Sequence, residues 1–359
     1  MERINNQITV VVGMSGGVDS SVAALLLKQQ GFKVIGLHMQ GENKQTAKED
    51  QQRVQELCKK LDIELFVTEY KNEMQIVKDY FINEYLAGRT PNPCVVCNRE
   101  VKFKPFIEFT EKLNAQYFAT GHYAKIEHID GKNILKVAKD KNKDQTYFLC
   151  QLSSKQLDKA LFPLGELTKT EVRKIAEENG LISAQTKESY DVCFLGSQKF
   201  KDFMDSNYPE KAGNIIDVNS GKIVGKHTGI SKYTLGQRKG LGIGGRNDGN
   251  GQSWFVSGKD VKSNTLYVTQ GEGKELLSKE LISGQVNWIM DKPNKTEFSC
   301  FAKFRYRQSD QKVIVKIIED GKVKVVFDQP QRAVTPGQYV VFYDNDICLG
   351  GATIEKIIK

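Results

Sequence analysis

The chain has 359 residues, 39% of them hydrophobic and 27% charged, and its 52 basic and 44 acidic residues give a net charge of +8. This composition is typical of a soluble globular protein of two or three domains, and the basic excess permits a nucleic-acid partner without requiring one. No uncharged apolar run reaches the roughly 18 residues that a membrane span needs. The start, MERINNQ, lacks the apolar segment of a signal peptide, so we expect a cytoplasmic protein. The seven cysteines then argue against a disulfide framework.

The first 200 residues alternate strand-like and helix-like stretches, which predicts a doubly wound, parallel-sheet α/β domain over residues 1–204. The first helix-like run ends on Gly31, a natural C-cap, and the last begins with Thr168 and Glu171 in capping-box spacing. The strand-like runs occupy 7–13, 33–39, 64–70 and 115–126. The helix-like runs occupy 20–31, 46–62, 73–88 and 168–180.

The loop GMSGGVDS between the first strand and the first helix allows two interpretations. Read from Gly13, it satisfies G-x-S-x-G, the turn that presents the nucleophile of α/β hydrolases, with Ser15 as that nucleophile. In those enzymes the turn usually follows several strands, and the histidine comes last of the catalytic residues. Here the turn follows the first predicted strand, and His227, the last histidine, precedes more than a hundred residues of β-rich sequence. The hydrolase interpretation is therefore strained.

The second interpretation, a nucleotide-binding loop, needs fewer assumptions. Gly16 and Gly17 let backbone N–H groups approach a pyrophosphate, and the following helix points its positive end at that anion. Ser15 and Ser20 add hydroxyl donors, and Asp19 can hold a magnesium ion that bridges the phosphates. Short glycine-rich matches are usually turns without a ligand. The serines and the aspartate in this turn nevertheless favour the nucleotide.

The stretch GRTPNPCVVCNREVKF places Cys94 and Cys97 in C-x-x-C spacing between prolines and basic residues. The prolines predict an extended, rigid loop, and Arg89, Arg99 and Lys102 are neighbours that favour thiolates. A structural zinc site would need a second cysteine or histidine pair. A thioredoxin-like redox pair would need the start of a helix, and buried structural cysteines do not suit a polar loop. A reactive thiol fits this stretch best.

Another cysteine, Cys193 in SYDVCFLG, lies at the end of the α/β region among aromatic and apolar residues. Taken alone, it would be a core residue. Considered together with Cys97, it becomes the candidate sulfur carrier.

The second half of the chain has a different texture. After about residue 205, frequent glycines and turn signals, among them Asn219-Ser220-Gly221 and Asn247-Asp248-Gly249, predict a small β-rich domain over residues 205–279. Short strand-like runs then predict a closed or partly closed β-barrel over residues 280–359. These runs occupy 286–290, 298–308, 312–320, 322–328, 338–346 and 352–359.

Taken together, the motifs resemble one family closely. GMSGGVDSS, RTPNPCVVCNREVKF, ATGHYA, KDQTYFL, FPLGELTKTEVR, YDVCFLG, HTGISKYTLGQRKGLGIGG and FRYRQ occur in the order of the tRNA-specific 2-thiouridylases, from about residue 8 to the C-terminus. The S-G-G-x-D-S loop is similar to that of the ATP-pyrophosphatase superfamily. The resemblance implies an enzyme that uses ATP and Mg²⁺ to adenylate the C2 oxygen of a wobble uridine in tRNA, and that replaces this oxygen with sulfur.

The resemblance also implies site residues. Cys193 matches the persulfide-carrying cysteine, and Cys97 matches the thiol that completes the transfer and leaves a Cys97–Cys193 disulfide to be reduced. His122 is assigned no catalytic role, because a lone histidine is more often structural. The implied ATP-binding residues are Gly13, Met14, Ser15, Gly16, Gly17, Val18, Asp19, Ser20, Met39 and Gly121.

Asn92, Pro93 and Cys94 match the family's contact to the target base, but many members carry aspartate where this chain has Cys94. The change brings a third thiol to Cys97 and Cys193, the arrangement in which some related thiolating enzymes hold an iron–sulfur cluster. A cluster-dependent mechanism is therefore an alternative to the persulfide, because three cysteines leave one iron open for sulfide.

Two further motifs match tRNA contacts of the family: Lys143, Asp144 and Gln145, and Arg305 with Tyr306 in the barrel. Strand alternation puts Lys303, Arg305 and Arg307 on one face and Phe304 and Tyr306 on the other. A basic face suits phosphates and a tyrosine can stack on a base, whereas the alternative is an ordinary solvated charge run. The implied partners are a tRNA with a wobble uridine and a sulfur donor, either a cysteine desulfurase or a sulfur-relay protein, and neither DNA nor a membrane.

Two other functions stay open on the sequence. Another adenylating enzyme of the superfamily, such as an amidotransferase or a lysidine-forming synthetase, would need neither Cys97 nor Cys193. A tRNA-binding protein that has lost catalysis would show no ATP–pyrophosphate exchange with tRNA present.

Overall fold

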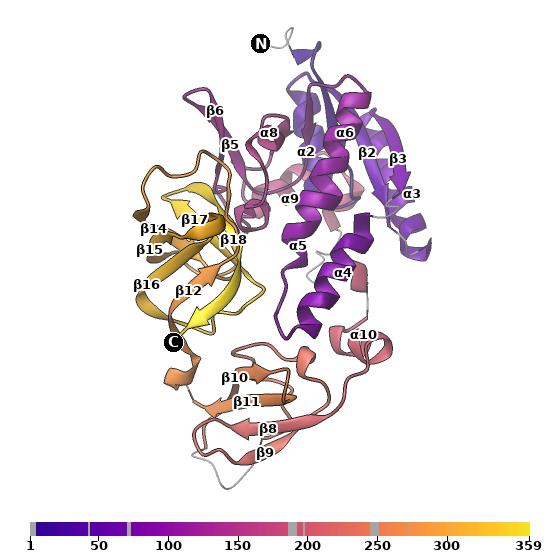
Figure 1. Cartoon of the computed structure of the whole chain (residues 1–359). Helices are drawn as coiled ribbons and strands as arrows, with labels where there is room; N and C mark the ends of the chain where they lie inside the picture. Colours follow the sequence, from indigo (N-terminus) through magenta and orange to yellow (C-terminus); the bar gives the residue numbers. More distant parts are fainter. Residues whose placement is uncertain are drawn as a thin grey trace.

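The structure is a computed structural model, and it describes residues 5–41, 44–69, 73–185, 192–196, 198–244, 251–271 and 273–359. Figure 1 shows an α/β domain, a β domain at the bottom of the view and a C-terminal barrel at its left. None of the helices within these ranges is long and apolar enough to cross a membrane.

The α/β domain is built on a parallel sheet, as the alternating pattern predicted. Its strands run in the order β3-β2-β1-β4-β7, and every neighbouring pair is parallel. The chain therefore builds outward from β1 on one side and then crosses to β4 on the other, which creates a switch point between β1 and β4. The strands are β1 (Thr9–Gly13), β2 (Lys33–Gln40), β3 (Glu64–Glu69), β4 (Tyr117–Ala119) and β7 (Ala160–Leu161).

The helices of this domain lie where the apolar periodicity placed them. Thr168 and Glu171 form the predicted capping box, and Gly31 takes the left-handed φ of +85° that ends a helix. The bounds are α2 (Val18–Gln29), α3 (Lys44–Leu61), α4 (Glu73–Leu86) and α9 (Lys169–Glu178).

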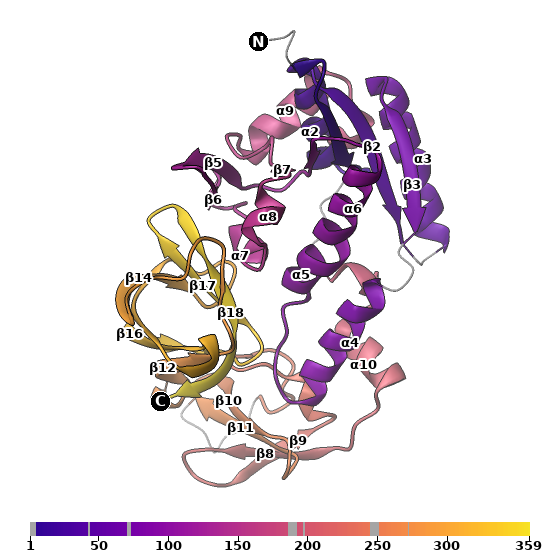
Figure 2. The same ribbon diagram turned by 45° about the horizontal axis from the view of Figure 1, so that its top comes forward.

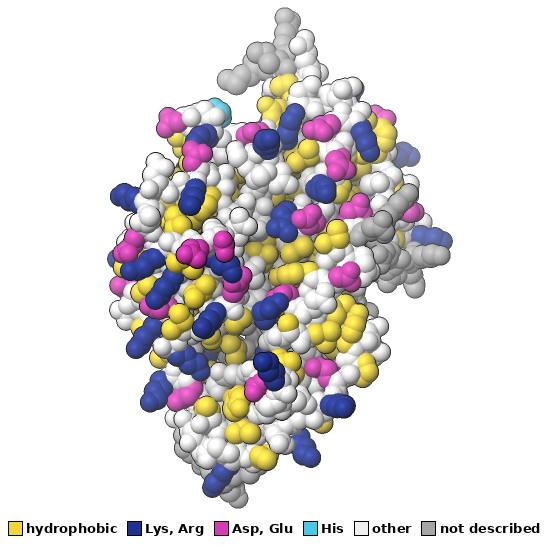
Figure 3. Space-filling view, viewed as in Figure 1, with side chains coloured by type: hydrophobic (Ala, Val, Ile, Leu, Met, Phe, Trp, Pro, Cys, Tyr) yellow, Lys and Arg dark blue, Asp and Glu magenta, His cyan; other side chains and the backbone are white. Residues whose placement is uncertain are grey.

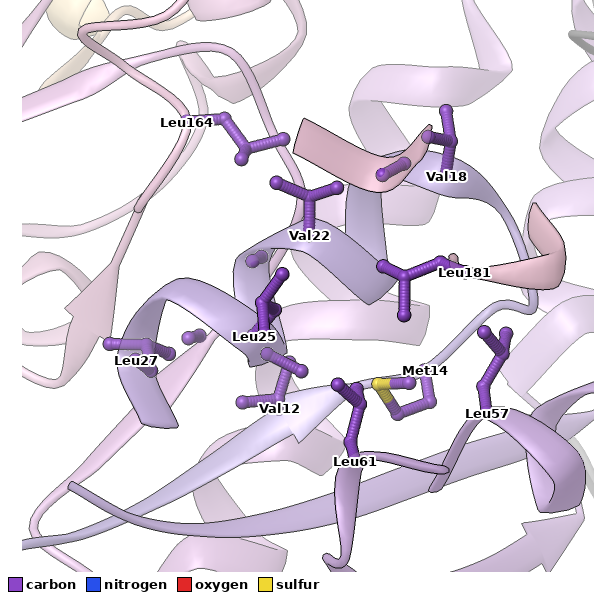
Figure 4. Packing of buried hydrophobic residues seen from close by; sticks show 14 of the residues in the cluster. Val12, Met14, Val18, Val22, Leu25, Leu27, Leu57, Leu61, Leu164 and Leu181 are labelled. Carbon is purple, nitrogen blue, oxygen red and sulfur yellow. The ribbon is translucent and has the colours of Figure 1, made fainter. Parts of the chain in front are cut away.

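Helix α2 is buried on nearly all sides, because β1 covers one face and the segment after α9 covers another. Figure 4 shows Val22 and Leu25 of α2 packing among Val12, Leu164 and Leu181. Full burial of each such aliphatic side chain stabilises the folded state by about 1.5–3 kcal/mol. This packing fixes the start of α2, and with it the glycine-rich loop, against the end of β1.

The C-x-x-C stretch is helical, so the prediction of an extended loop is wrong. Helix α5 (Pro93–Val96) continues into a π-helix, η1 (Cys97–Phe103), and then into α6 (Lys104–Lys112). Pro93 is compatible with the first helical turn, where its missing N–H group needs no partner. The prolines therefore mark the entry to a helix, and the cysteines lie at its start.

A hairpin, β5 (Lys125–Ile129) and β6 (Lys132–Lys136), was not predicted. The run 115–126 was expected to be one strand that leads into a loop, but β4 ends at Ala119 and β5 begins after a break. The hairpin leaves the parallel sheet, and Lys136 pairs with Ile347 in the barrel. Two short helices follow, α7 (Thr146–Leu149) and α8 (Ser154–Leu157).

The central domain is a mixed sheet with strand order β10-β11-β8-β9. The turn predicted at Asn219-Ser220-Gly221 joins β8 to β9, whereas the one at Asn247-Asp248-Gly249 lies outside the described residues. The elements are α10 (Phe200–Asn207), β8 (Gly213–Asp217), β9 (Ile223–His227), β10 (Trp254–Asp260) and β11 (Thr265–Gln270).

The C-terminal strands close into the predicted barrel, because β12 pairs with both β16 and β18 at the ends of the order β12-β16-β15-β14-β17-β18. The alternation expected through Arg307 is wrong beyond Lys303, where the strand ends and the chain turns. The bounds are β12 (Leu277–Ser283), β13 (Asn287–Trp288), β14 (Glu297–Lys303), β15 (Gln311–Ile317), β16 (Val323–Arg332), β17 (Tyr339–Asp344) and β18 (Ile347–Ile358).

The segment that enters α5 is held by the other two domains. The Thr90 N–H group donates to the Pro336 carbonyl (2.9 Å), and Gln338 Nε2 donates to the carbonyls of Thr90 (2.9 Å) and Pro91 (3.1 Å). Thr90 Oγ1 also lies 3.2 Å from Thr234 Oγ1 of the central domain. Figure 2 shows α4, α5 and α6 beside the barrel and above the central sheet. On the face in Figure 3, basic side chains are interspersed with acidic ones.

Candidate active site

The glycine-rich loop forms a compact turn between β1 and α2. Gly16 has a φ of +78°, which favours glycine. The Ser15 N–H group donates to Ser20 Oγ (3.2 Å), and the Ser20 hydroxyl donates to the Gly17 carbonyl (3.1 Å). These bonds fix the loop on the helix N-terminus, where backbone N–H groups suit an anion.

A cavity of about 240 Å³ opens over this loop at the switch point between β1 and β4. Gly121 allows a close approach there, because a Cβ atom on it would lie 2.7 Å from the Asp19 carbonyl carbon and 2.8 Å from the Ser20 nitrogen. Val18 is buried in the core instead of facing the cavity. The lining residues include the predicted Gly13, Met14, Ser15, Asp19, Ser20, Met39 and Gly121, together with Leu37, Lys102, Phe106, Thr120, His122 and Gln145.

Asp19 is held by two residues that the sequence did not single out. Lys169 Nζ, at the start of α9, lies 2.7 and 2.8 Å from the two Asp19 carboxylate oxygens, and the Tyr123 hydroxyl donates to Oδ1 (2.8 Å). The position of Lys169, directly after the predicted N-cap Thr168, was the available signal. The pair places a positive charge beside the glycine-rich loop and partly neutralises the Asp19 carboxylate.

His122 lines the same cavity and is buried. Burial, helped by the charge of Lys102, holds the pKa of His122 well below its ordinary value. Its Nδ1 lies 2.8 Å from Thr120 Oγ1. The imidazole is therefore neutral at physiological pH and orders the loop after β4.

The structure brings Cys97 and Cys193 together, although they lie nearly a hundred residues apart in the chain. Cys97 is buried at the start of the π-helix, and Cys193 is exposed on a short 3₁₀ turn, η3 (Cys193–Leu195). Phe194 anchors this turn, because its ring meets that of Phe81 with centroids 5.1 Å apart. The buried and exposed thiols thus sit on two separate, well-packed segments.

The two thiols differ in acidity. A hydrogen bond from the Cys97 thiol to the Cys193 sulfur lowers the pKa of Cys193 below its ordinary value, against the effect of burial. The same bond, together with burial, raises the pKa of Cys97 well above its ordinary value. Cys193 is therefore the thiolate of the pair, and Cys97 is the hydrogen-bond donor.

Cys94 lies one helical turn before Cys97 and is exposed, although the surrounding protein still desolvates its sulfur. This desolvation raises the pKa of Cys94, and the negative charge of Cys193 raises it further. Cys94 therefore faces the same site as the other two thiols but stays protonated beside the Cys193 thiolate.

Lys102 connects the two halves of the site. Its side chain lines the cavity above the glycine-rich loop, and its charge acts on Cys94, Cys97 and Cys193. It lies in the π-helix, whose wider turn is often found at functional sites. The sequence had suggested it only as one of several basic neighbours.

The cofactor expectations can be tested on the residues present. Asp19 is a single carboxylate beside the phosphate loop, and Mg²⁺ is commonly held by one or two carboxylates together with substrate phosphates. Within the described residues, no three His, Cys, Asp or Glu side chains are placed to hold a metal ion. In this structure a hydrogen bond joins two of the three thiols, Cys97 and Cys193.

Several predicted tRNA-contact residues of the α/β domain are buried, and one lines the cavity over the glycine-rich loop. Asp144 is buried, accepts from the Ala138 N–H group (3.0 Å) and the Thr146 hydroxyl (2.7 Å), and so shapes its loop from inside. Asn92 and Pro93 are also buried, at the entry to α5. Gln145 lines the cavity over the glycine-rich loop.

The barrel residues Arg305 and Tyr306 lie on the turn after β14. Arg305 Nη2 donates to the carbonyls of Leu235 (3.0 Å) and Ala333 (2.8 Å), which ties the barrel to the central domain. The Tyr306 ring lies against Phe148, with centroids 4.3 Å apart. Arg305 is exposed and Tyr306 is half-buried, so both reach the surface next to α7.

Comparison with known proteins covers the whole chain. Family models described as the tRNA methyl transferase HUP domain, the tRNA methyl transferase PRC-barrel domain and the aminomethyltransferase beta-barrel domain match residues 8–197, 201–270 and 278–354. The tRNA-specific 2-thiouridylase MnmA of Bacillus cereus is 50% identical over 100% of this chain and 98% of its own. The MnmA of Alkaliphilus oremlandii is 49% identical over 100% of both chains.

Among solved structures, the U34-tRNA thiolase NcsA from Methanococcus maripaludis with its [4Fe-4S] cluster is 19% identical, with a TM-score of 0.38. It covers 57% of this chain and 68% of its own. Nothing about the sulfur chemistry of this chain follows from a likeness at that level.

Proposed function

The chain belongs to the tRNA-specific 2-thiouridylase family, and from this premise we propose that it uses ATP to replace the C2 oxygen of a wobble uridine in tRNA with sulfur. The observation that carries the proposal is one helix, residues 93–112, that presents Cys94 and Cys97 at its start and Lys102 to the cavity over the glycine-rich loop. Adenylation and sulfur transfer can then act on the same base.

In the first step, the uracil O2 attacks the α-phosphorus of ATP and pyrophosphate leaves. Backbone N–H groups of the glycine-rich loop and the hydroxyls of Ser15 and Ser20 hold the phosphates. Lys169 offsets the charge of Asp19, so that this carboxylate does not repel the nucleotide. A magnesium ion held by Asp19 would neutralise phosphate charge.

In the second step, a persulfide on Cys193 delivers the sulfur. The low thiol pKa of Cys193 suits it to accept sulfur from a donor protein, either a cysteine desulfurase or a sulfur-relay protein. The terminal sulfur attacks C2 and AMP leaves. Cys97 then gives its proton to the site, attacks the Cys193 sulfur and releases the thiocarbonyl, so that a Cys97–Cys193 disulfide remains.

We assign adenylation and sulfur transfer to residues 1–204 and tRNA contact mainly to the barrel, residues 280–359, with residues 205–279 between them. Asn92, Pro93 and Cys94 would face the target base. Of the other contacts, Lys143, Gln145, Arg305 and Tyr306 would reach tRNA directly, and Asp144 would hold its loop in place.

The alternative is the same reaction with an iron–sulfur cluster on Cys94, Cys97 and Cys193. The test is iron and labile sulfide content after anaerobic purification, measured with thiolation of a wobble-uridine tRNA. We expect activity in iron-free protein, lost in Cys97→Ala and Cys193→Ala and kept in Cys300→Ala, a thiol on barrel strand β14. Activity that tracks bound iron would overturn the persulfide route in favour of the cluster.

The same variants separate the remaining alternatives. ATP–pyrophosphate exchange in the presence of tRNA should persist in Cys97→Ala, because the nucleotide cavity does not use this thiol. An amidotransferase or lysidine-forming enzyme would keep its full activity in both cysteine variants. A protein that only binds tRNA would show no exchange at all.

A further inference from the structure

The C-x-x-C stretch lies at the start of a helix, the position typical of a redox-active cysteine pair, whereas an extended loop was predicted from the sequence. The Cys97 N–H group donates to the Cys94 carbonyl, so the two cysteines share one helical turn. Residues three apart in a helix have Cα atoms about 5 Å apart. This separation falls within the range of about 4.4–6.8 Å found in disulfides. Cys94 and Cys97 can therefore bond to each other without moving the backbone far.

A disulfide between Cys97 and Cys193 is not easy to reduce from outside. Cys97 is buried, with 6% of its surface exposed, so an external thiol meets the exposed Cys193 sulfur instead. Attack there must expel Cys97, whose pKa is raised, and thiol–disulfide exchange slows as the pKa of the leaving thiol rises. Attack on the Cys97 sulfur would expel Cys193, the better leaving group, but only a neighbouring thiol can reach it.

We propose that Cys94 is that neighbour and that Cys94 and Cys97 act as a resolving dithiol; this inference rests on the proposed function, which leaves the Cys97–Cys193 disulfide. The Cys94 sulfur attacks the Cys97 sulfur, the Cys97–Cys193 bond breaks and a Cys94–Cys97 bond forms. Cys193 leaves as a thiolate, and the proton of Cys94 passes to solvent. No net oxidation occurs in this step. An external dithiol reductant then reduces the Cys94–Cys97 disulfide through the exposed Cys94 sulfur.

The charges around Cys94 determine when its thiol can act as a nucleophile. While Cys193 is a thiolate, its negative charge helps to keep Cys94 protonated. Once Cys193 is bound in a disulfide, that charge is gone, whereas Lys102 still favours a thiolate at Cys94. Cys94 thus becomes nucleophilic when the disulfide has formed, and the released Cys193 is free to accept the next sulfur.

The test follows the disulfides through one turnover. Enzyme, ATP, a persulfide donor and a wobble-uridine tRNA react without reductant, and free thiols are then alkylated before tryptic digestion. Trypsin releases Cys94 and Cys97 together in TPNPCVVCNR and Cys193 in ESYDVCFLGSQK. In the native chain we expect an internal disulfide in the first peptide and alkylated Cys193. In Cys94→Ser we expect the two peptides to be cross-linked.

A second measurement separates the resolving step from any contact between Cys94 and the target base, because loss of that contact would slow the single-turnover rate as well. The multiple-turnover rate at a limiting dithiol concentration is divided by the single-turnover rate of the same variant. This ratio should fall by about tenfold in Cys94→Ser and in Cys94→Asp. Native enzyme that makes thiolated tRNA and keeps the peptides cross-linked, or an unchanged ratio, would overturn the resolving role alone. Thiolated tRNA without any disulfide, or no thiolated tRNA, would overturn the proposed function itself.

Discussion

The nucleotide cavity and the thiol site meet at Lys102, yet they are built differently. The floor of the cavity is one continuous glycine-rich loop, fixed by bonds among Ser15, Gly17 and Ser20, although other lining residues come from distant parts of the chain. The thiol site joins Cys97 on a helix to Cys193 on a distant turn, and its chemistry depends on one hydrogen bond between them. We therefore expect phosphate binding by this loop to depend mainly on local structure, and sulfur transfer to depend on tertiary packing. Variants that affect one region and spare the other should reveal this difference.

The largest effect is expected at Lys169, on the nucleotide side. In Lys169→Met, the Asp19 carboxylate loses its cation and repels the phosphates. We expect ATP–pyrophosphate exchange and tRNA thiolation to fall together by about 100-fold. Alkylation of Cys193 should keep its native rate, because the thiol site does not depend on this pair.

Lys174→Met is the matched control, since Lys174 lies on the same helix but is exposed and pairs with Glu178. It should keep native exchange and thiolation. Thiolation that falls in Lys169→Met while exchange stays native would contradict a role for Lys169 at the phosphates.

A smaller effect is expected at Lys102, which serves both regions. The hydrogen bond from Cys97, with help from Lys102, lowers the pKa of Cys193 to about 6. Alkylation of Cys193 should therefore rise as the pH increases through about 6 and then level off, because only the thiolate reacts. In Lys102→Gln the lost charge raises this pKa, so the rise should move to higher pH by about half a unit to one unit. Thiolation should fall by about tenfold.

The variant Lys102→Arg keeps the positive charge, so the pH dependence of Cys193 alkylation should stay close to that of the native enzyme. Lys104 is an exposed charge two residues further along the helix, and Lys104→Gln should leave this pH dependence unchanged. An identical alkylation profile in Lys102→Gln would show that Lys102 does not act on the thiols.

The local geometry around the glycine-rich loop agrees with the sequence for a physical reason. The glycine-rich loop, its strand and its helix are adjacent in the chain, so residue spacing alone implies their geometry. Lys169 was missed because its partner, Asp19, is 150 positions away. Gly121 entered through the family resemblance, and the close approach of its backbone to Ser20 explains why a side chain would not fit.

On the thiol side, the sequence singled out Cys94, Cys97 and Cys193 as candidates but did not predict the structure that surrounds them. Two prolines suggested a loop, yet Pro93 lies in the first turn of α5, where proline is tolerated. The π-helix has no local signature, and the packing of Phe194 on Phe81 depends on the whole fold. The extension of β14 through Arg307 failed similarly, because the strand ends at Lys303 and the chain turns there.

The smallest effect is expected at Gln338, a barrel residue that touches neither ATP nor the thiols. Its amide donates to the carbonyls of Thr90 and Pro91 at the entry to the cysteine helix. Loss of these bonds in Gln338→Ala should cost about 1 kcal/mol locally, so amide hydrogen exchange in residues 89–97 should accelerate about fivefold. Thiolation should fall about threefold while ATP–pyrophosphate exchange stays native, because only the thiol side depends on this tertiary contact.

The control is Gln329→Ala, because Gln329 is an exposed residue of the same barrel. If both activities fell equally, the barrel would support the whole α/β domain, and the division between local and tertiary construction would not hold.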